Sequence, residues 1–223
     1  MKIGIIGGVS PFAFSQFYNM LCEKYRKISK GIYPELLIYS IQVSDRQENA
    51  FLENNINKEI QGELEKEIEK ACNLFQDNKI ETIIICCNTL SNIFYNIANK
   101  YDFKNIITPV NSVISYIEEV EFKNTLLLAT GYTNKNLYLE LDSIIHLNEA
   151  EQKVVEDFIK NKINNIRDKK KEFNEIINNY NSSIDSIILG CTDIEKGDLD
   201  NIDKIKILDS VELMINKTLK IMR

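Results

Sequence analysis

Residues 82–89 read TIIICCNT, a run of branched apolar residues that stops abruptly at a thiol and continues with small polar residues. Residues 186–193, SIILGCTD, repeat this arrangement. An apolar run bounded in this way is typical of a buried strand in a parallel sheet. Cys87 and Cys191 then fall at the carboxyl ends of two strands, where open α/β sheets form their ligand crevices. The repeated context predicts two thiols that face each other across a cleft.

Strand and helix patterns alternate along the rest of the chain, which predicts an α/β fold with parallel sheets covered by helices. The strands are expected at 2–7, 36–43, 81–86, 106–108, 125–130, 143–147, 184–189 and 205–208. The helices are expected at 11–27, 58–76, 91–100, 112–120, 136–141, 149–164, 168–180 and 211–222.

No linker rich in Pro, Gly or Ser divides the chain, and we place a domain boundary near residues 109–112. The first α/β domain is then predicted to consist of residues 1–111 plus 207–223, and the second α/β domain of residues 112–206. In this division the last strand and the last helix return to the first domain.

Composition limits the classes of function. The chain has 223 residues and a net charge of −6, which argues against nucleic acid or an anionic membrane surface as a partner. Its first apolar stretch, 3–6, is too short for a signal peptide or a membrane helix. Five cysteines without framework spacing indicate reduced thiols and a cytoplasmic location. The single histidine, His146, nearly excludes a His-based metal site or a Ser-His-Asp triad.

The glycines near the start of the chain do not form a nucleotide-binding motif. Gly4, Gly7 and Gly8 lack the GxGxxG spacing, and no GxxxxGK[ST] sequence is present. The simple interpretation is a tight turn from strand to helix, with Ser10 as the helix cap and Pro11 at the first helical position. The exposed amides of such a turn could also hold a carboxylate.

Two opposed thiols allow three interpretations. A disulfide is disfavoured in a reducing compartment. A metal site is also disfavoured, because it would need further soft ligands and the sequence contains no CxxC pairs. The third interpretation is acid–base chemistry on one carbon, in which one thiolate removes a proton and the opposite thiol delivers one, so that a stereocentre inverts. A thiol at a helix N-terminus is expected to have a lowered pKa, which suits this role. Asn88, Thr89 and Thr192 are suitable donors to the charge that develops on a substrate carboxylate.

The chain resembles the cofactor-independent aspartate/glutamate racemase superfamily, most closely its aspartate racemase branch. The motifs that carry the resemblance are GGVSP (7–11), DR (45–46), CNT (87–89), ATGYT (129–133) and GCTD (190–193). The resemblance extends from residue 2 to about residue 210. It implies two similar α/β domains related by pseudo-twofold symmetry, with the active site in the cleft between them.

The resemblance also implies racemisation of an acidic amino acid, with no pyridoxal phosphate, no metal and no other cofactor. Aspartate is the first choice of substrate, and the alternatives are glutamate or a broad specificity that includes other amino acids. Cys87 and Cys191 would be the two catalytic bases. The residues expected to bind the amino-acid substrate are Ser10, Arg46, Asn88, Thr89, Thr130, Thr133, Lys160 and Thr192. Relatives of this kind are often homodimers. Instead of binding substrate, Arg46 could form a surface ion pair with Asp45 or Glu48. Lys160 could simply be a solvated surface residue, and the nearby Lys162 is a second candidate for its binding role.

Four residues depart from the family pattern: Phe14, Leu90, Ser91 and Asp193, the last at a position where the family usually has Glu. These changes remove polar groups near the site, and they favour either a larger or less acidic substrate side chain or weaker catalysis. Two other hypotheses follow: a related isomerase or decarboxylase of dicarboxylic acids, and an inactive ligand-binding relative. Retention of both cysteines disfavours each of them, whereas Phe14, Leu90 and Ser91 favour the inactive relative.

Overall fold

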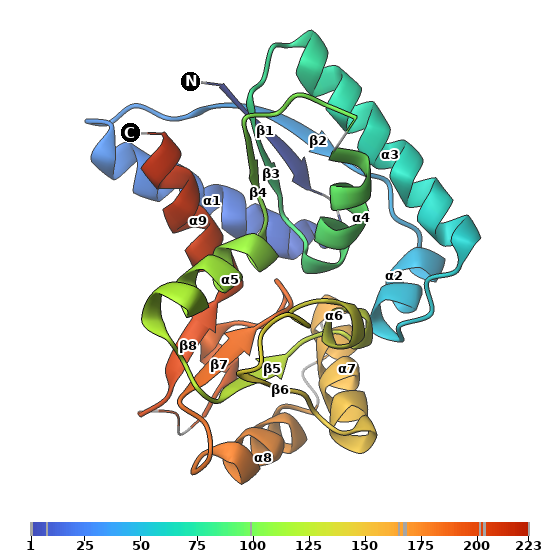
Figure 1. Cartoon of the computed structure of the whole chain (residues 1–223), viewed down its shortest axis with the longest axis vertical. Helices are drawn as coiled ribbons and strands as arrows, with labels where there is room; N and C mark the ends of the chain where they lie inside the picture. The colour runs from blue at the N-terminus through green and yellow to red at the C-terminus, as the bar shows by residue number, and fades with distance from the viewer. Residues whose placement is uncertain are drawn as a thin grey trace.

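The chain forms two four-stranded parallel sheets (Figure 1). The structure, a computed structural model, describes residues 2–7, 9–98, 100–164, 166, 169–200, 202 and 204–222. The first sheet has the order β2-β1-β3-β4 and consists of β1 (Lys2–Gly7), β2 (Glu35–Ser40), β3 (Thr82–Ile85) and β4 (Asn105–Ile107). The second has the order β6-β5-β7-β8 and consists of β5 (Thr125–Leu128), β6 (Ile144–Ile145), β7 (Ser186–Leu189) and β8 (Lys206–Asp209). The matching orders confirm the predicted fold class, with two similar parallel sheets.

Helices cover the faces of the sheets and connect their strands. They are α1 (Pro11–Ile28), α2 (Asp45–Leu52), α3 (Lys58–Asp77), α4 (Asn88–Ala98), α5 (Pro109–Val120), α6 (Gly131–Asn136), α7 (Glu149–Ile163), α8 (Lys170–Tyr180) and α9 (Ser210–Ile221). Among the described residues, none of these helices combines the length and the apolar character needed to span a bilayer.

The apolar run before Cys87 is a central strand that is buried on both faces. Successive residues of a strand point to opposite sides of the sheet. Ile83 and Ile85 belong to the core formed with α3 and α4, whereas Ile84 belongs to the core formed with α1 and α9. β7 is central and fully buried in the same way in the second sheet. Burial on both faces explains why the two runs are continuously apolar rather than alternating.

Two helices are exchanged between the sheets. α5 follows β4 of the first sheet, but its Val110 and Val113 pack in the core of the second sheet beside Leu127. α9 follows β8 of the second sheet, but its Met214 packs in the core of the first sheet beside Ile5. α5 and α9 also contact each other where the chain crosses between the sheets (Figure 1). This exchange holds the two sheets together around the space between them.

The structure corrects the predicted place of the last strand. β8 pairs with β7 in parallel register, Ile207 beside Ile187, so this strand belongs to the second sheet and not to the first domain. Its Leu208 is buried in the core of the second sheet, and that burial accounts for the pairing. α9, in contrast, packs in the core of the first sheet.

Two helices differ from the prediction. The helix expected at 136–141 is instead α6, which begins five residues earlier because Thr130 caps it, accepting a hydrogen bond from the Thr133 N–H at 3.3 Å. The short helix α2 was not predicted at all. Two predicted features, Gly8 of the opening turn and the helix start at Asp168, fall outside the described residues.

Candidate active site

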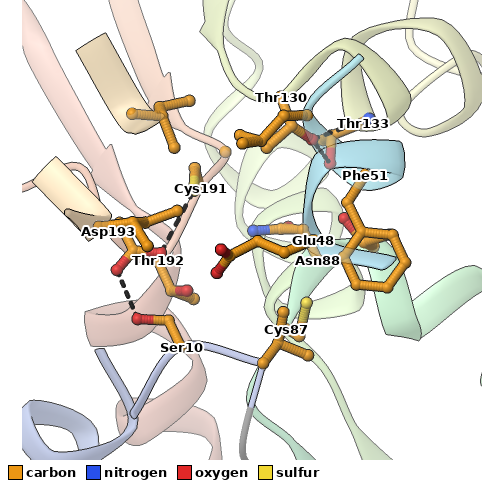
Figure 2. Close-up of a pocket in the computed structure, with 16 residues that line it drawn as sticks. Ser10, Glu48, Phe51, Cys87, Asn88, Thr130, Thr133, Cys191, Thr192 and Asp193 are labelled. Atoms are coloured by element: carbon orange, nitrogen blue, oxygen red, sulfur yellow. Dashed lines mark hydrogen bonds between the residues drawn. The ribbon is translucent and has the colours of Figure 1, made fainter. Parts of the chain in front are cut away.

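The two strand-end cysteines line one pocket between the sheets (Figure 2). Cys87 lies two residues after the end of β3 and directly before α4, and Cys191 lies two residues after the end of β7. Both are free thiols and both are buried, 8% and 9% exposed. The empty space of the pocket, counted out to its open mouth, is about 440 Å³. The predicted cleft with two thiols is therefore present, and the thiols are not joined in a disulfide.

The predicted polar residues gather around the thiols. Those that line the same pocket are Ser10, Asn88, Thr89, Thr130, Thr133 and Thr192. Within the described part of the chain, no group of three or more His, Cys, Asp or Glu side chains is arranged for a metal ion.

The environment of Cys87 combines burial with the start of a helix. Burial raises the pKa of the Cys87 thiol to about 11, while hydrogen bonds from the backbone N–H groups of Leu90 and Thr89 oppose that rise. The prediction of a lowered pKa at a helix N-terminus is therefore wrong for Cys87, because the cost of a buried anion exceeds the benefit of the helix. The helix partly offsets the desolvation of the thiolate without reversing it.

Cys191 is held next to a carboxylate. Its thiol donates a hydrogen bond to Asp193 Oδ2 at 3.8 Å, and Ser10 Oγ donates to Asp193 Oδ1 at 2.6 Å. Burial and then the charge of Asp193 raise the pKa of Cys191 well above its usual value. The Ser10 side chain therefore links the first sheet to the cysteine loop of the second, and the neighbouring Asp193 carboxylate disfavours the thiolate form of Cys191.

Asn88 carries a side-chain donor that has no partner among the residues the structure describes. Tyr138 Oη donates to Asn88 Oδ1 at 2.9 Å, which fixes the orientation of the amide. The Asn88 Nδ2 group is buried and has no hydrogen-bond partner among the described residues. Buried donors are rarely left unpaired, so this group is suited to bind an acceptor on a ligand.

Gly190 is required where β7 turns into the cysteine loop. A Cβ atom at this position would lie 2.7 Å from Leu127 Cδ1 and 2.9 Å from the Ala129 Cβ. Both neighbours are fully buried, so the strand end would have to move away from β5.

Gly190→Ala is expected to lower the free energy of unfolding by about 1–3 kcal/mol, because overpacking a dense core is costly. The same shift would displace the adjacent Cys191. Denaturant unfolding measures the loss of stability. Gly62→Ala, at a helical position with open space around it, is the matched control. Equal unfolding free energies for Gly190→Ala and the native chain would contradict the prediction.

Two predicted substrate-binding residues do not line the pocket. The Arg46 side chain is half exposed and pairs with α3, at 2.7 Å from Glu63 and 3.3 Å from Glu59. Lys160 is exposed on α7, although its neighbours Ile159 and Ile163 line the pocket. Burial raises the pKa of Glu48, and the charge of Lys160 partly opposes that rise. The expected carboxylate clamp is therefore not assembled in this structure, and the Arg46 partners are Glu59 and Glu63 rather than Asp45 or Glu48.

Sequence reasoning missed the contribution of α2. This helix places Glu48, Phe51 and Leu52 in the pocket wall. It begins at a capping box in which Ser44 Oγ accepts from the Gln47 N–H and Gln47 Oε1 accepts from the Ser44 N–H. The S-x-x-Q spacing of that box was the available sequence signal.

Comparisons with known proteins agree with this fold. Residues 6–218 match the family described as Asp/Glu/hydantoin racemase. Glutamate racemase of Fusobacterium nucleatum is 24% identical over 170 residues, which cover 71% of this chain and 63% of that protein. The matched region thus spans less than two thirds of that relative.

Solved structures with a similar fold cover almost the whole chain. An aspartate racemase homologue from Pyrococcus horikoshii has a TM-score of 0.74 at 24% identity, covering 99% of this chain and 98% of its own. The aspartate racemase of Picrophilus torridus has a TM-score of 0.71 at 21% identity, covering 98% and 94%. The match over residues 6–218 includes both sheets and both cysteine motifs, and the chain belongs to the Asp/Glu/hydantoin racemase family.

Proposed function

We propose that the chain racemises an amino acid at Cα with Cys87 and Cys191 as its two acid–base groups and without a cofactor. The observation that carries this proposal is the presence of two free, buried thiols in one pocket, at the carboxyl ends of β3 and β7, one interior strand from each sheet. Such a position is where side chains from two elements can reach opposite faces of one bound molecule.

The reaction needs two proton transfers. One cysteine, as the thiolate, takes the proton from Cα, and the electron pair left on Cα is delocalised into the α-carboxylate. The other cysteine, as the thiol, gives its proton to the opposite face of Cα and becomes the thiolate. The enantiomer is released, and solvent returns the protons to their starting positions before another turnover in the same direction.

The start of α4 supplies stabilisation for the charge that builds up on the carboxylate. Asn88 Nδ2 is an unpaired buried donor there, and the positive end of the helix dipole lies at the same place. Donors that are already fixed before the reaction stabilise a developing oxyanion without reorganising. These groups support binding of the α-carboxylate beside Cys87.

The raised thiol pKa values fit a strong base that is used only when substrate is present. A thiolate whose conjugate acid has a pKa of about 11, as in Cys87, is a stronger base than an ordinary thiolate. A bound substrate ammonium group would favour this anion, since a nearby opposite charge stabilises it. The pocket therefore suits proton abstraction from a bound amino acid. It suits nucleophilic attack less well, because that reaction would need a cysteine that is ionised before the substrate binds.

The identity of the amino acid is a separate question. Aspartate is the substrate that the resemblance favours, and the relatives named above include aspartate and glutamate racemases. The pocket lining supports racemisation but gives no support to aspartate in particular. In the ranges that the structure describes, no Lys or Arg lines the pocket to bind the side-chain carboxylate of aspartate. A homodimer and a cytoplasmic location remain predictions.

The proposal is tested by incubating the purified protein in D₂O with a panel of single enantiomers and no added cofactor. The panel contains acidic, amide, aliphatic and basic amino acids. A racemase exchanges the α-proton and forms the opposite enantiomer, which NMR and chiral chromatography detect. Absence of exchange with every member of the panel would defeat the proposal.

Arg46→Ala is expected to leave KM unchanged, because the guanidinium is held on the surface by Glu59 and Glu63. Exposed ion pairs also contribute little to stability, so the melting temperature should change only slightly. Steady-state kinetics on whichever substrate the panel identifies gives the answer. A large rise in KM would show that Arg46 leaves its surface partners to bind substrate.

A further inference from the structure

Glu48 is an acidic residue in the wall of the pocket that the reaction proposed above does not use. It lies in the first turn of α2, and its carboxylate points into the space between Cys191 and Cys87 (Figure 2). The second acidic residue in the wall, Asp193, is tied to Ser10 and Cys191. The pocket therefore presents two carboxylates to a ligand, and they differ in the hydrogen bonds that they already accept from the protein.

The Glu48 carboxylate has no hydrogen-bond or ion-pair partner among the residues that the structure describes, in contrast to its neighbours on the same helix. Arg46 pairs with Glu63, and Gln47 Nε2 donates to Glu63 Oε2 at 2.9 Å. Both neighbours are thus drawn towards α3, away from the pocket. Burial, and after it the charge of Asp193, raise the pKa of Glu48. These features describe a carboxylate with no cation in direct contact among the described residues, although the charge of Lys160 reaches it.

The rest of the wall offers no positive side chain to balance these acids. The apolar members of the wall are Val9, Phe51, Leu52, Ile159 and Ile163. Over the described ranges no Lys or Arg lines the pocket, and Lys160, whose charge reaches Glu48, is exposed. An amino acid with an acidic side chain would bring a second carboxylate of its own into this space. Its α-carboxylate can be met by Asn88, but the side-chain carboxylate would face like charges.

We propose that the pocket selects amino acids whose side chains carry no negative charge, and that Glu48 sets this choice by repelling side-chain carboxylates. This inference rests on the racemase function proposed above. An amide or aliphatic side chain meets the apolar wall without a charge conflict, and a basic side chain would provide the cation that Glu48 lacks. Selectivity of this kind depends on an unfavourable contact with the wrong substrate as much as on attraction to the right one.

Isosteric substrate pairs isolate the effect of charge. Exchange of the α-proton in D₂O is followed by NMR for L-Asn against L-Asp and for L-Gln against L-Glu, with L-Ala, L-Met and L-ornithine alongside. The protein is compared with Glu48→Gln and with Glu53→Gln. Glu53 is exposed at the C-terminal end of the same helix and does not line the pocket, so it controls for loss of one charge from α2.

The native protein is expected to exchange each amide at least about tenfold faster than the matching acid, and Glu48→Gln is expected to reduce that ratio at least about fivefold. Glu53→Gln should leave the ratio unchanged. Faster exchange of Asp or Glu than of their amides by the native protein would overturn the inference while leaving the racemase function intact. An equal loss of exchange with all substrates in Glu48→Gln would also overturn it, since Glu48 would then serve binding in general. Absence of exchange with every amino acid would instead defeat the proposed function, and this inference with it.

Discussion

Replacement of either Cys87 or Cys191 by alanine is expected to lower the rate of racemisation by about 10²–10⁴-fold, the usual contribution of a positioned acid or base. In free energy this is about 3–5 kcal/mol of lost transition-state stabilisation. Both thiols are needed in every turnover, one as base and one as acid. The two enantiomers have equal free energies in water, so each variant must lose kcat/KM equally in both directions.

The two variants should nevertheless differ in a partial reaction. A variant that keeps one cysteine can still remove the α-proton from the enantiomer whose proton faces that cysteine, and return a solvent deuteron to the same face. We therefore expect slow exchange without inversion, with opposite enantiomers preferred by Cys87→Ala and Cys191→Ala. This result would assign each cysteine to its enantiomer.

Cys86→Ala is the matched control for these variants. Cys86 is adjacent to Cys87 and buried, but it belongs to the core formed with α1 and α9 and does not line the pocket. Its loss should affect stability more than catalysis. Near-normal turnover by Cys87→Ala or Cys191→Ala, with the fold intact by circular dichroism, would contradict the two-base scheme.

The rate at low substrate concentration is expected to rise about tenfold for each unit of pH between about pH 6.5 and pH 8.5, or about 100-fold across the range. Burial raises the pKa of Cys87 to about 11, so at neutral pH only a small fraction is thiolate, and that fraction grows tenfold per unit. Cys191 is raised well above its usual value, and it remains the thiol that the reaction needs as acid. The active form of the pair is therefore favoured by higher pH.

A pH–rate profile of kcat/KM provides the measurement. The upper limit of the range comes from stability, because buried neutral thiols stabilise the fold only while they stay protonated. Burial raises the pKa of Cys72 to about 12, so its contribution is complete below the ordinary thiol value of 9.0 and is lost as pH rises from 9.0 towards 12. A profile that is flat from about pH 6.5 upwards would mean that a thiolate is already formed in the free enzyme, contrary to this account.

Much of the fold could be predicted from local patterns. The runs before Cys87 and Cys191 identified the two central strands because burial on both faces requires continuous apolar residues. The place of β8 could not be read in this way. Its pattern fits the edge of either sheet, and the pairing with β7 depends on contacts between distant parts of the chain.

The positions of site residues that directly follow a strand could be predicted from the sequence. The interactions of side chains that pair with distant parts of the chain could not. Ser10, Asn88 and Thr192 lie where the strand ends predicted. Arg46 does not, because Glu59 and Glu63 on α3 compete for its guanidinium, and only the packing of α3 beside α2 reveals them. The direction of the thiol pKa shift was also predicted wrongly, because the depth at which a thiol is buried depends on the whole fold and not on the local sequence.

The central claim, that Cys87 and Cys191 act on opposite faces of one substrate, is tested most directly by the position of deuterium in early turnovers. The native protein is given one enantiomer of its best substrate in D₂O, and substrate and product are separated by chiral chromatography and analysed by mass spectrometry. Two bases predict that the newly formed enantiomer carries deuterium at Cα from the first turnovers while the remaining substrate keeps its proton. Product that retains the original proton, or deuterium that appears equally in both enantiomers at the earliest times, would show that a single group carries the proton and would contradict the account.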